Sequence, residues 1–299
     1  MDNGRTDQCS QGMVTRYPTT DPDTALVPVS EGHQPTMSAT PVDSGTWVRR
    51  FHPSPDAGAR LVCFPHAGGS ASYYFPVSAA MSPSIEVLAL QYPGRQDRRT
   101  DPLIESLPEL ADQIFTALRP FADRPLTLFG HSMGATLAFE VATRFEQVGA
   151  PVSGLFVSGR RAPSTHRSET VHLRSDDGIV SELHQLNGTD SGLLGDEELL
   201  RMVLPAIRGD YKAIETYRYE PGPPLSCPVH AMVGDADPKA TLDEVRAWRD
   251  HTTGPFEFEA LPGGHFYLNQ YQKEIVNRIS DHIACAAQPE SFPSTRTGR

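Results

Sequence analysis

Short apolar runs alternate with amphipathic stretches along the chain, and this alternation restricts the fold more than any other feature of the sequence. Several runs are continuously apolar, which is typical of strands in a parallel sheet that is covered on both faces. The expected strands are residues 60–64, 85–90, 126–129, 154–158, 229–233 and 256–261, and the expected helices are residues 106–118, 134–148 and 273–284. Such alternation predicts a doubly wound α/β fold, a mostly parallel sheet with helices on both faces.

One region departs from this rhythm. About residues 164–220 contain no clear strand; residues 176–186 and 197–217 have helical periodicity instead, and Pro205 is expected to kink the second helix. Helices inserted between strands predict a lid over the open end of the sheet. The alternative is that they are covering helices without a gating role.

Both ends of the chain differ in composition from its middle. Residues 1–45 are rich in Asp, Thr, Ser, Gly and Pro and carry almost no apolar periodicity, and residues 287–299 are similar. Segments of this composition cannot bury enough apolar surface to fold alone. The sequence therefore predicts two disordered tails around one folded domain of residues 46–286.

The charge and the cysteine content disfavour several classes of protein. Lys and Arg number 26 against 37 Asp and Glu, a formal net charge of −11, which disfavours binding to nucleic acid or to an anionic membrane. No apolar run approaches the roughly 20 residues of a membrane-spanning helix, and the first residues lack the apolar region of a secretory signal. The cysteines match neither a disulfide framework nor a zinc-ligand pattern; they are Cys9, Cys63, Cys227 and Cys285. We expect a monomeric cytoplasmic protein without a metal.

A Gly-His-Ser-Met-Gly motif at residues 130–134 lies between an expected strand and an expected helix. This is the context of a nucleophile elbow, a tight turn that holds a serine in a strained backbone conformation with its hydroxyl exposed. Gly130 and Gly134 let neighbouring backbone pass close by, and the helix N-terminus places N–H groups near the reacting oxygen. Ser132 is therefore the candidate nucleophile.

A serine hydroxyl needs a general base, and in this fold the chain order is Ser, then Asp or Glu, then His. His265 follows two glycines after the last expected strand, so a flexible loop can carry its imidazole across the sheet edge. His230 is expected to be a packed residue inside a strand, and His251 is expected to be solvated. Three more histidines fall in the helical insert: His166, His172 and His184.

The carboxylate that orients the imidazole is expected at the end of an earlier strand. Residues 234–238, Gly-Asp-Ala-Asp-Pro, follow the expected strand at 229–233 and offer both Asp235 and Asp237. One of the two could instead cap the next helix or turn. Sequence spacing alone does not separate them.

The reaction also needs two backbone N–H donors for the oxyanion. One should belong to Met133, directly after the candidate nucleophile, and the other to the loop after an early strand. Residues 65–70, Pro-His-Ala-Gly-Gly-Ser, form that loop, and the N–H of Ala67 is the best second candidate. The alternative is a plain glycine turn. His66 precedes the nucleophile in the chain, which suits a role in shaping the loop.

Five motifs in this order resemble the type II thioesterases, stand-alone α/β-hydrolases that accompany modular polyketide synthases and non-ribosomal peptide synthetases. The resemblance covers about residues 47–285, and the long N-terminal segment is not part of the family pattern. The motifs are Phe-Pro-His-Ala-Gly-Gly-Ser at 64–70, Gln-Tyr-Pro-Gly-Arg at 91–95, Gly-His-Ser-Met-Gly-Ala at 130–135, Gly-Asp-Ala-Asp at 234–237 and Gly-Gly-His-Phe at 263–266.

The resemblance implies an α/β-hydrolase with a Ser132–His265–Asp237 triad and oxyanion donors at Ala67 and Met133. It also implies a substrate, an acyl group held as a thioester on the phosphopantetheine arm of a carrier protein. Members of the family remove stalled or wrong acyl units through an acyl-serine intermediate and so restore blocked synthases. No metal or nucleotide cofactor is implied.

A carrier-protein partner raises a question of charge, because an acidic enzyme is a poor match for an acidic carrier protein. We therefore expect a local basic patch, with Arg95, Arg98 and Arg99 as candidates. The alternative is that these arginines are solvated or bind the chain's own carboxylates.

Three other functions share parts of this pattern. A carboxylesterase or lipase acting on small free esters would use the same triad. An acyltransferase or cyclase would pass the acyl group to a hydroxyl or amine in place of water. A non-catalytic binding protein on the same fold is disfavoured, because Ser132, Asp237 and His265 occur together in one chain.

Overall fold

The computed structural model describes residues 44–186 and 197–286, and the two expected tails therefore lie almost entirely outside the described residues. A seven-stranded sheet runs through the molecule in the order β1-β3-β2-β4-β5-β6-β7. Every neighbouring pair is parallel except β1 and β3. The strands are β1 (Val48–Arg49), β2 (Arg60–Phe64), β3 (Glu86–Leu90), β4 (Leu126–His131), β5 (Gly154–Ser158), β6 (Val229–Gly234) and β7 (Phe256–Leu261). The predicted mostly parallel α/β sheet is confirmed.

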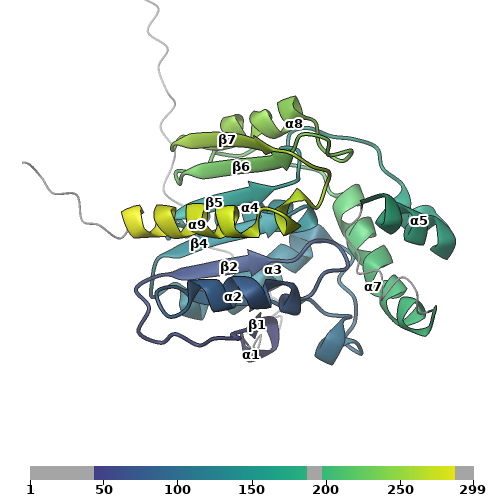
Figure 1. Cartoon of the computed structure of the whole chain (residues 1–299), viewed down its shortest axis with the longest axis horizontal. Helices are drawn as coiled ribbons and strands as arrows, with labels where there is room; N and C mark the ends of the chain where they lie inside the picture. The colour runs from purple at the N-terminus through teal and green to yellow at the C-terminus, as the bar shows by residue number, and fades with distance from the viewer. Residues whose placement is uncertain (1–43, 187–196, 287–299) are drawn as a thin grey trace, which may run out of the picture. The chain divides into compact units, whose positions relative to one another are not determined.

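Helices cover both faces of this sheet (Figure 1). Each face has its own buried apolar cluster, with α3, α4 and α8 contributing to one and α2 and α9 to the other. The bounds are α1 (Ser44–Trp47), α2 (Phe75–Met81), α3 (Leu107–Leu118), α4 (Met133–Gln147), α8 (Leu242–Arg246) and α9 (Gln272–Ala286). The inner strands β2, β3, β4 and β5 are buried along their whole length, which explains why their sequences read as unbroken apolar runs.

The sequence-based element assignment is confirmed for each expected strand and for the helices now labelled α3, α4 and α9, with ends shifted by one or a few residues. The short elements β1, α2 and α8 carry too few residues for a periodic signal, and they were not expected. Ser106 caps α3 by accepting a hydrogen bond from the Glu109 N–H, and the polar cap explains why that helix begins where it does.

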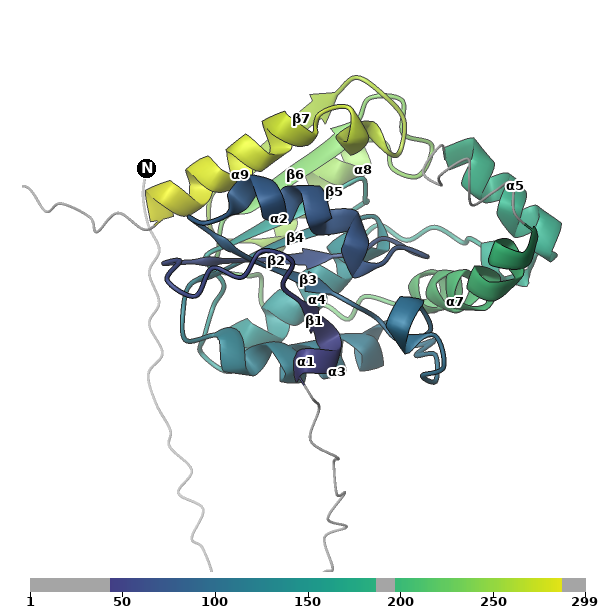
Figure 2. The same ribbon diagram turned by 60° about the horizontal axis from the view of Figure 1, so that its bottom comes forward.

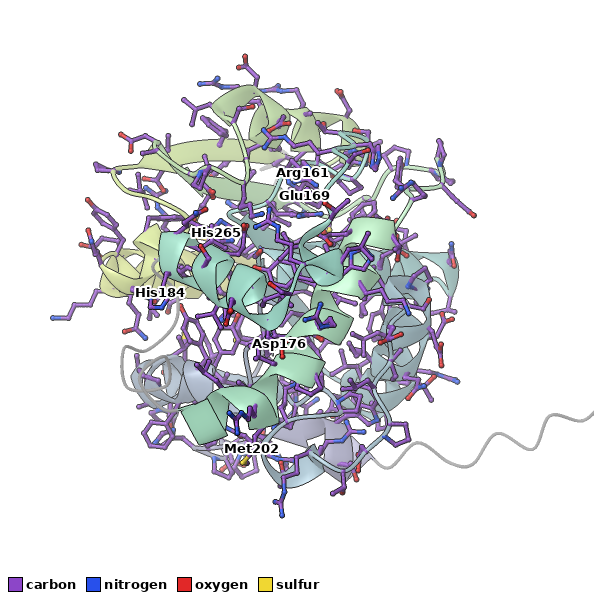
Figure 3. All side chains as sticks on the ribbon, turned by 90° about the vertical axis from the view of Figure 1, so that its right-hand side faces the viewer. Arg161, Glu169, Asp176, His184, Met202 and His265 are labelled. Atoms are coloured by element: carbon purple, nitrogen blue, oxygen red, sulfur yellow. The ribbon has the colours of Figure 1, made fainter. Side chains whose placement is uncertain are left out.

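Two helices, α5 (Asp176–Leu186) and α7 (Glu197–Thr216), lie between β5 and β6 in the chain. They stand beyond one end of the sheet (Figure 2) and share a small apolar cluster of their own with the segment before α5. Figure 3 shows them from outside, with Asp176 and His184 on α5 and Met202 on α7. Pro205 lies inside α7, which continues past it to Thr216. Their position agrees with the predicted lid.

The parallel register decides which loops meet beneath this lid. Gly130 near the end of β4 pairs with Phe64 of β2 and with Val157 of β5, so the carboxyl ends of these strands lie at one edge. The loops that follow β2, β4, β5, β6 and β7 therefore leave the sheet together. In open parallel sheets this edge is where active sites form.

Candidate active site

Ser132 occupies the sharp turn between β4 and α4. Its backbone has φ 54° and ψ −120°, a conformation that non-glycine residues rarely adopt. The turn is held by a hydrogen bond from the Ser132 N–H to the Ser158 carbonyl, 2.8 Å long. A Cβ on Gly130 would lie 2.1 Å from the Gly134 carbonyl oxygen, and one on Gly134 would lie 2.1 Å from the Phe64 carbonyl oxygen. Both glycines are therefore required by the close passage of backbone.

Ser132, His265 and Asp237 form a continuous hydrogen-bonded chain. His265 Nε2 lies 3.0 Å from Ser132 Oγ, and His265 Nδ1 lies 2.9 Å from the nearer Asp237 oxygen. A carboxylate can only accept, so Nδ1 carries the proton and Nε2 is left to accept the serine proton. His265 and Asp237 are 3% and 8% exposed, which keeps this pair away from competing water.

Asp235 and Asp237, which sequence spacing could not separate, have different contacts. Asp235 is exposed and accepts a hydrogen bond from the Gly263 N–H at 2.9 Å, so it supports the loop that carries His265. Asp237 faces the imidazole and also accepts from the Lys239 N–H at 2.8 Å. The geometry therefore places Asp237 as the partner of His265.

Two further histidines lie beside His265 and are held neutral. Burial, the positive charge that His265 can carry and nearby Arg95 lower the pKa of His66 to about 3. Burial, His265 and His66 lower the pKa of His131 well below its usual range. Neither ring therefore competes with His265 for a proton near neutral pH. His66 lies in the loop of residues 65–70 and lines the cavity beside Ser132.

The expectation of a solvated His251 is wrong. Its side chain is 3% exposed, lies 2.9 Å from the Ser164 hydroxyl and packs edge-on against Trp248 and Phe139. The polar residues around His251 in the sequence gave no sign that a short 3-10 helix, Ala247–His251, packs its ring against Phe139 of α4. His230 is only half-buried, stacked on Phe156 with ring centroids 4.2 Å apart, so it is less enclosed than a core residue.

The loop of residues 65–70 is held from the lid side. Asp210 on α7 accepts the Gly68 N–H at 2.7 Å, and both of its oxygens bind the Arg95 guanidinium, at 2.8 and 2.9 Å. Arg95 in turn donates to the Gly69 carbonyl at 3.2 Å. Sequence reasoning missed Asp210, because its partners lie far away in the chain. Ala67 and Met133, the expected oxyanion donors, line the cavity beside Ser132.

The basic patch expected at Arg95, Arg98 and Arg99 is not formed. Arg95 is 7% exposed and pairs with Asp210; Arg98 is 8% exposed, pairs with Asp101 and lies over the Trp47 ring. Arg99 is exposed. The alternative reading, that these arginines bind the chain's own carboxylates, is confirmed for Arg95 and Arg98.

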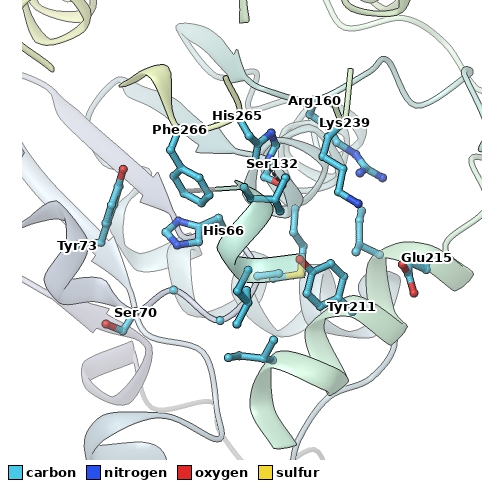
Figure 4. Close-up of a pocket in the computed structure, with 18 of the residues that line it drawn as sticks. His66, Ser70, Tyr73, Ser132, Arg160, Tyr211, Glu215, Lys239, His265 and Phe266 are labelled. Carbon is cyan, nitrogen blue, oxygen red and sulfur yellow. Dashed lines mark hydrogen bonds between the residues drawn. The ribbon is translucent and has the colours of Figure 1, made fainter. Parts of the chain in front are cut away.

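A cavity of about 630 Å³ lies between the sheet edge and the lid and contains Ser132 in its wall. Figure 4 shows two different sides. His66, Tyr73 and Phe266 form an aromatic side. Arg160, Lys239 and Glu215 form a charged side. Leu183, Ile207 and Ile214 of the two lid helices add apolar surface.

The described residues offer no group of three or more His, Cys, Asp or Glu arranged to hold a metal ion. None of the described helices is long and apolar enough to cross a membrane. Cys63 and Cys227 are buried free thiols and Cys285 is an exposed one, whereas Cys9 lies outside the described residues.

Comparison with known proteins identifies the family. Residues 59–283 match the family model described as Thioesterase domain. The chain is 55% identical over 244 residues to thioesterase PikA5 of Streptomyces venezuelae, covering 81% of this chain and 87% of that protein. It is 51% identical over 281 residues to a probable cadicidin biosynthesis thioesterase of Streptomyces griseus, covering 93% and 76%.

A solved structure agrees with these relatives. The type II thioesterase BorB from the borrelidin biosynthetic cluster superimposes with a TM-score of 0.76 at 53% sequence identity, covering 80% of this chain and 98% of that one. With the hydrogen-bonded serine at its elbow and the sheet described above, the chain belongs to the thioesterase family, among the type II thioesterases of the α/β-hydrolase fold.

Proposed function

We propose that this protein is an editing thioesterase that hydrolyses stalled or aberrant acyl thioesters from the phosphopantetheine arms of carrier proteins during polyketide or non-ribosomal peptide biosynthesis. The observation that carries the proposal is the Ser132–His265–Asp237 chain of hydrogen bonds, 3.0 and 2.9 Å long, inside a cavity under a helical lid. The names of the relatives, which include biosynthetic thioesterases, support the thioester substrate.

The proposed reaction has two halves. Ser132 attacks the thioester carbonyl while His265 Nε2 takes its proton, and the backbone N–H groups of Ala67 and Met133 stabilise the oxyanion. The tetrahedral intermediate then collapses, the carbon–sulfur bond breaks and His265 gives the proton to the leaving thiol. Water activated by His265 attacks the acyl-Ser132 ester and releases the acid. Asp237 holds the imidazole in the correct tautomer and stabilises its charged form.

Several finer expectations belong to this proposal. The partner is an acyl or peptidyl carrier protein, the enzyme works as a monomer in the cytoplasm, and the reaction uses neither a metal nor a nucleotide. The acidic net charge of −11 supports the expectation that nucleic acid and anionic membranes are not partners.

Hydrolysis of acetyl-, propionyl- and longer acyl-carrier-protein thioesters, followed by mass spectrometry of the carrier, tests the proposal. We expect free carrier thiol to appear with the wild-type protein. With Ser132→Ala, its release should be slower by about a thousandfold or more. A protein that leaves every loaded carrier intact but cleaves a small nitrophenyl ester would instead be a carboxylesterase on this fold.

A further inference from the structure

Arg160 follows β5 and lines the active-site cavity on its charged side. Within residues 44–186 and 197–286, its guanidinium makes no hydrogen bond or ion pair. The acidic side chains that act on it electrostatically are engaged elsewhere. Glu169 binds Arg161 at 2.5 Å, and Glu215 binds the His172 ring at 2.5 Å. Arg160 is thus a cation at the active site without a partner in the described part of the chain.

The environment of Arg160 is unfavourable for an isolated charge. Burial, together with the neighbouring Arg161 guanidinium, lowers the pKa of Arg160 to about 9. Arg160 is half-buried, and a partly desolvated cation is stabilised by an anion with which it can form hydrogen bonds. An anionic group on a bound substrate would meet this need.

Arg160 also belongs to a second cavity, of about 280 Å³, which shares Arg160, Ile214 and Glu215 with the main one. We name this cavity the arginine hollow, because Arg160, Arg161, Arg167 and Arg218 line it. This clustering contrasts with the net charge of −11 of the whole chain.

The four arginines of the hollow differ in their partners. Arg161 pairs with Glu169, and Arg167 pairs with Glu244. Arg218 is exposed, and its Nη1 donates to the carbonyls of residues 215 and 217, at 2.9 and 2.8 Å. Arg160 and Arg218 are therefore the two arginines of the hollow that have no carboxylate partner among the described residues.

The opposite side of the cavity has the character of an acyl site. Tyr73 packs edge-on against His66 with ring centroids 4.9 Å apart, and Phe266 does the same at 4.9 Å. His66 is neutral near pH 7, because its pKa is lowered to about 3. An uncharged acyl chain fits this side, and an anion fits the side of Arg160.

We propose that the arginine hollow binds the phosphate of the phosphopantetheine arm through Arg160 and Arg218. The arm then leaves Ser132 on the Arg160 side, and the acyl group lies on the side of His66, Tyr73 and Phe266. The phosphate is the end of the arm remote from the thioester, and the arginine hollow borders the main cavity through Arg160, Ile214 and Glu215 but does not contain Ser132. The guanidinium fork matches phosphate oxygens in geometry and charge. This inference rests on the proposed function.

Two substrates that differ only in the phosphate test it: acetyl-4′-phosphopantetheine and acetyl-pantetheine. We expect the wild-type protein to have a kcat/KM about tenfold higher for the phosphorylated substrate, mainly through a lower KM. Arg160→Gln and Arg218→Gln should each remove most of that ratio. Arg218 is exposed, so its variant tests the site even if Arg160→Gln unfolds, which circular dichroism would reveal.

Arg99→Gln is the matched control, since Arg99 is an exposed arginine outside both cavities; it should keep the wild-type ratio. A wild-type ratio near one, or an equal loss on both substrates in the arginine variants, would overturn the phosphate site. A loss of kcat/KM in Arg160→Gln that is confined to malonyl-pantetheine would also overturn it, because the Arg160 guanidinium would then bind the carboxylate of the acyl group. If the wild-type protein cleaved neither thioester, the proposed function itself would fail.

Discussion

The strained backbone of Ser132 and the burial of Asp237 both support the hydrogen-bonded chain that joins Ser132, His265 and Asp237. With φ at 54°, Ser132 directs its hydroxyl away from the sheet and toward His265 Nε2, 3.0 Å away. The strained conformation persists because the backbone at Gly130 and Gly134 is packed closely against neighbouring backbone, which leaves the turn no room to relax. Asp237 supplies a buried negative charge beside an imidazole that must become positive during the reaction.

Asp237→Asn should separate the two carboxylates by activity. An amide that donates to His265 Nδ1 would favour the wrong tautomer, so we expect kcat to fall by about ten-thousandfold with little change in KM. Asp235→Asn is the matched control, because Asp235 is exposed and contacts the Gly263 N–H instead; it should keep kcat within about tenfold. Steady-state hydrolysis of one acyl thioester measures both, and similar losses in the two variants would contradict the assignment of Asp237.

The lid helices are fastened to the two loops that carry the reaction. On α7, Asp210 binds Arg95 and the Gly68 N–H, next to the proposed oxyanion donor. On α5, Glu182 binds Lys239, whose N–H donates to Asp237. We expect that opening of the lid at α7 would release the loop of residues 65–70 and so change the position of the proposed oxyanion donor in that loop.

Asp210→Ala tests this coupling at the level of the elements. It leaves the buried Arg95 guanidinium unpaired, and we expect a loss of about 3 to 5 kcal/mol in the free energy of unfolding. We also expect at least about a tenfold lower kcat/KM, because Gly68 loses the acceptor that fixes its peptide. Urea unfolding and thioester hydrolysis measure the two effects.

The exposed pair between Arg208 of α7 and Asp176 of α5 is the matched control for Asp210. Asp176→Ala should change the free energy of unfolding by less than about 1 kcal/mol and leave activity near the wild-type value. Equal effects of Asp176→Ala and Asp210→Ala would contradict a special role for the buried pair.

At the scale of the whole molecule, we expect the buried histidines His66 and His131 to make stability depend on pH. The pKa values of His66 and His131 are lowered by burial, so both rings stay neutral in the folded protein below pH 6.5. The unfolded chain, with ordinary histidine pKa values of about 6.5, binds protons there that the folded protein does not. Stability is therefore lost as pH falls below about 6.5.

Urea unfolding at pH 7.5 and at pH 5.0 measures this loss. We expect His66 to contribute about 1 to 2 kcal/mol of it, since each pH unit below 6.5 costs about 1.4 kcal/mol per neutral histidine. In His66→Gln, the free energy of unfolding should fall between pH 7.5 and pH 5.0 by about 1 to 2 kcal/mol less than in the wild-type protein. Staying above pH 4.5 avoids Glu169, whose pKa is lowered to about 2 by Lys239 and Arg161 against the effect of burial. An unchanged decrease in His66→Gln would show that His66 titrates normally.

The sequence by itself determined the local elements and the order of the reacting groups. Continuous apolar runs predict buried parallel strands because both faces of such strands are covered, and helical spacing predicts α3, α4, α9 and the two lid helices. The motif at residues 130–134 predicts the elbow, since its glycines answer a purely local steric demand. The lid, Ser132 and His265 could thus be predicted before any distance was known.

Only the tertiary structure decided which charged groups meet. Asp210 is 115 positions from Arg95, and no periodic pattern in the sequence relates the two. The same holds for the burial of His251 and for Arg160, which has no carboxylate partner among the described residues. Local pattern reports which face of an element is apolar, whereas the partner of a buried charge depends on the folding of distant segments around it.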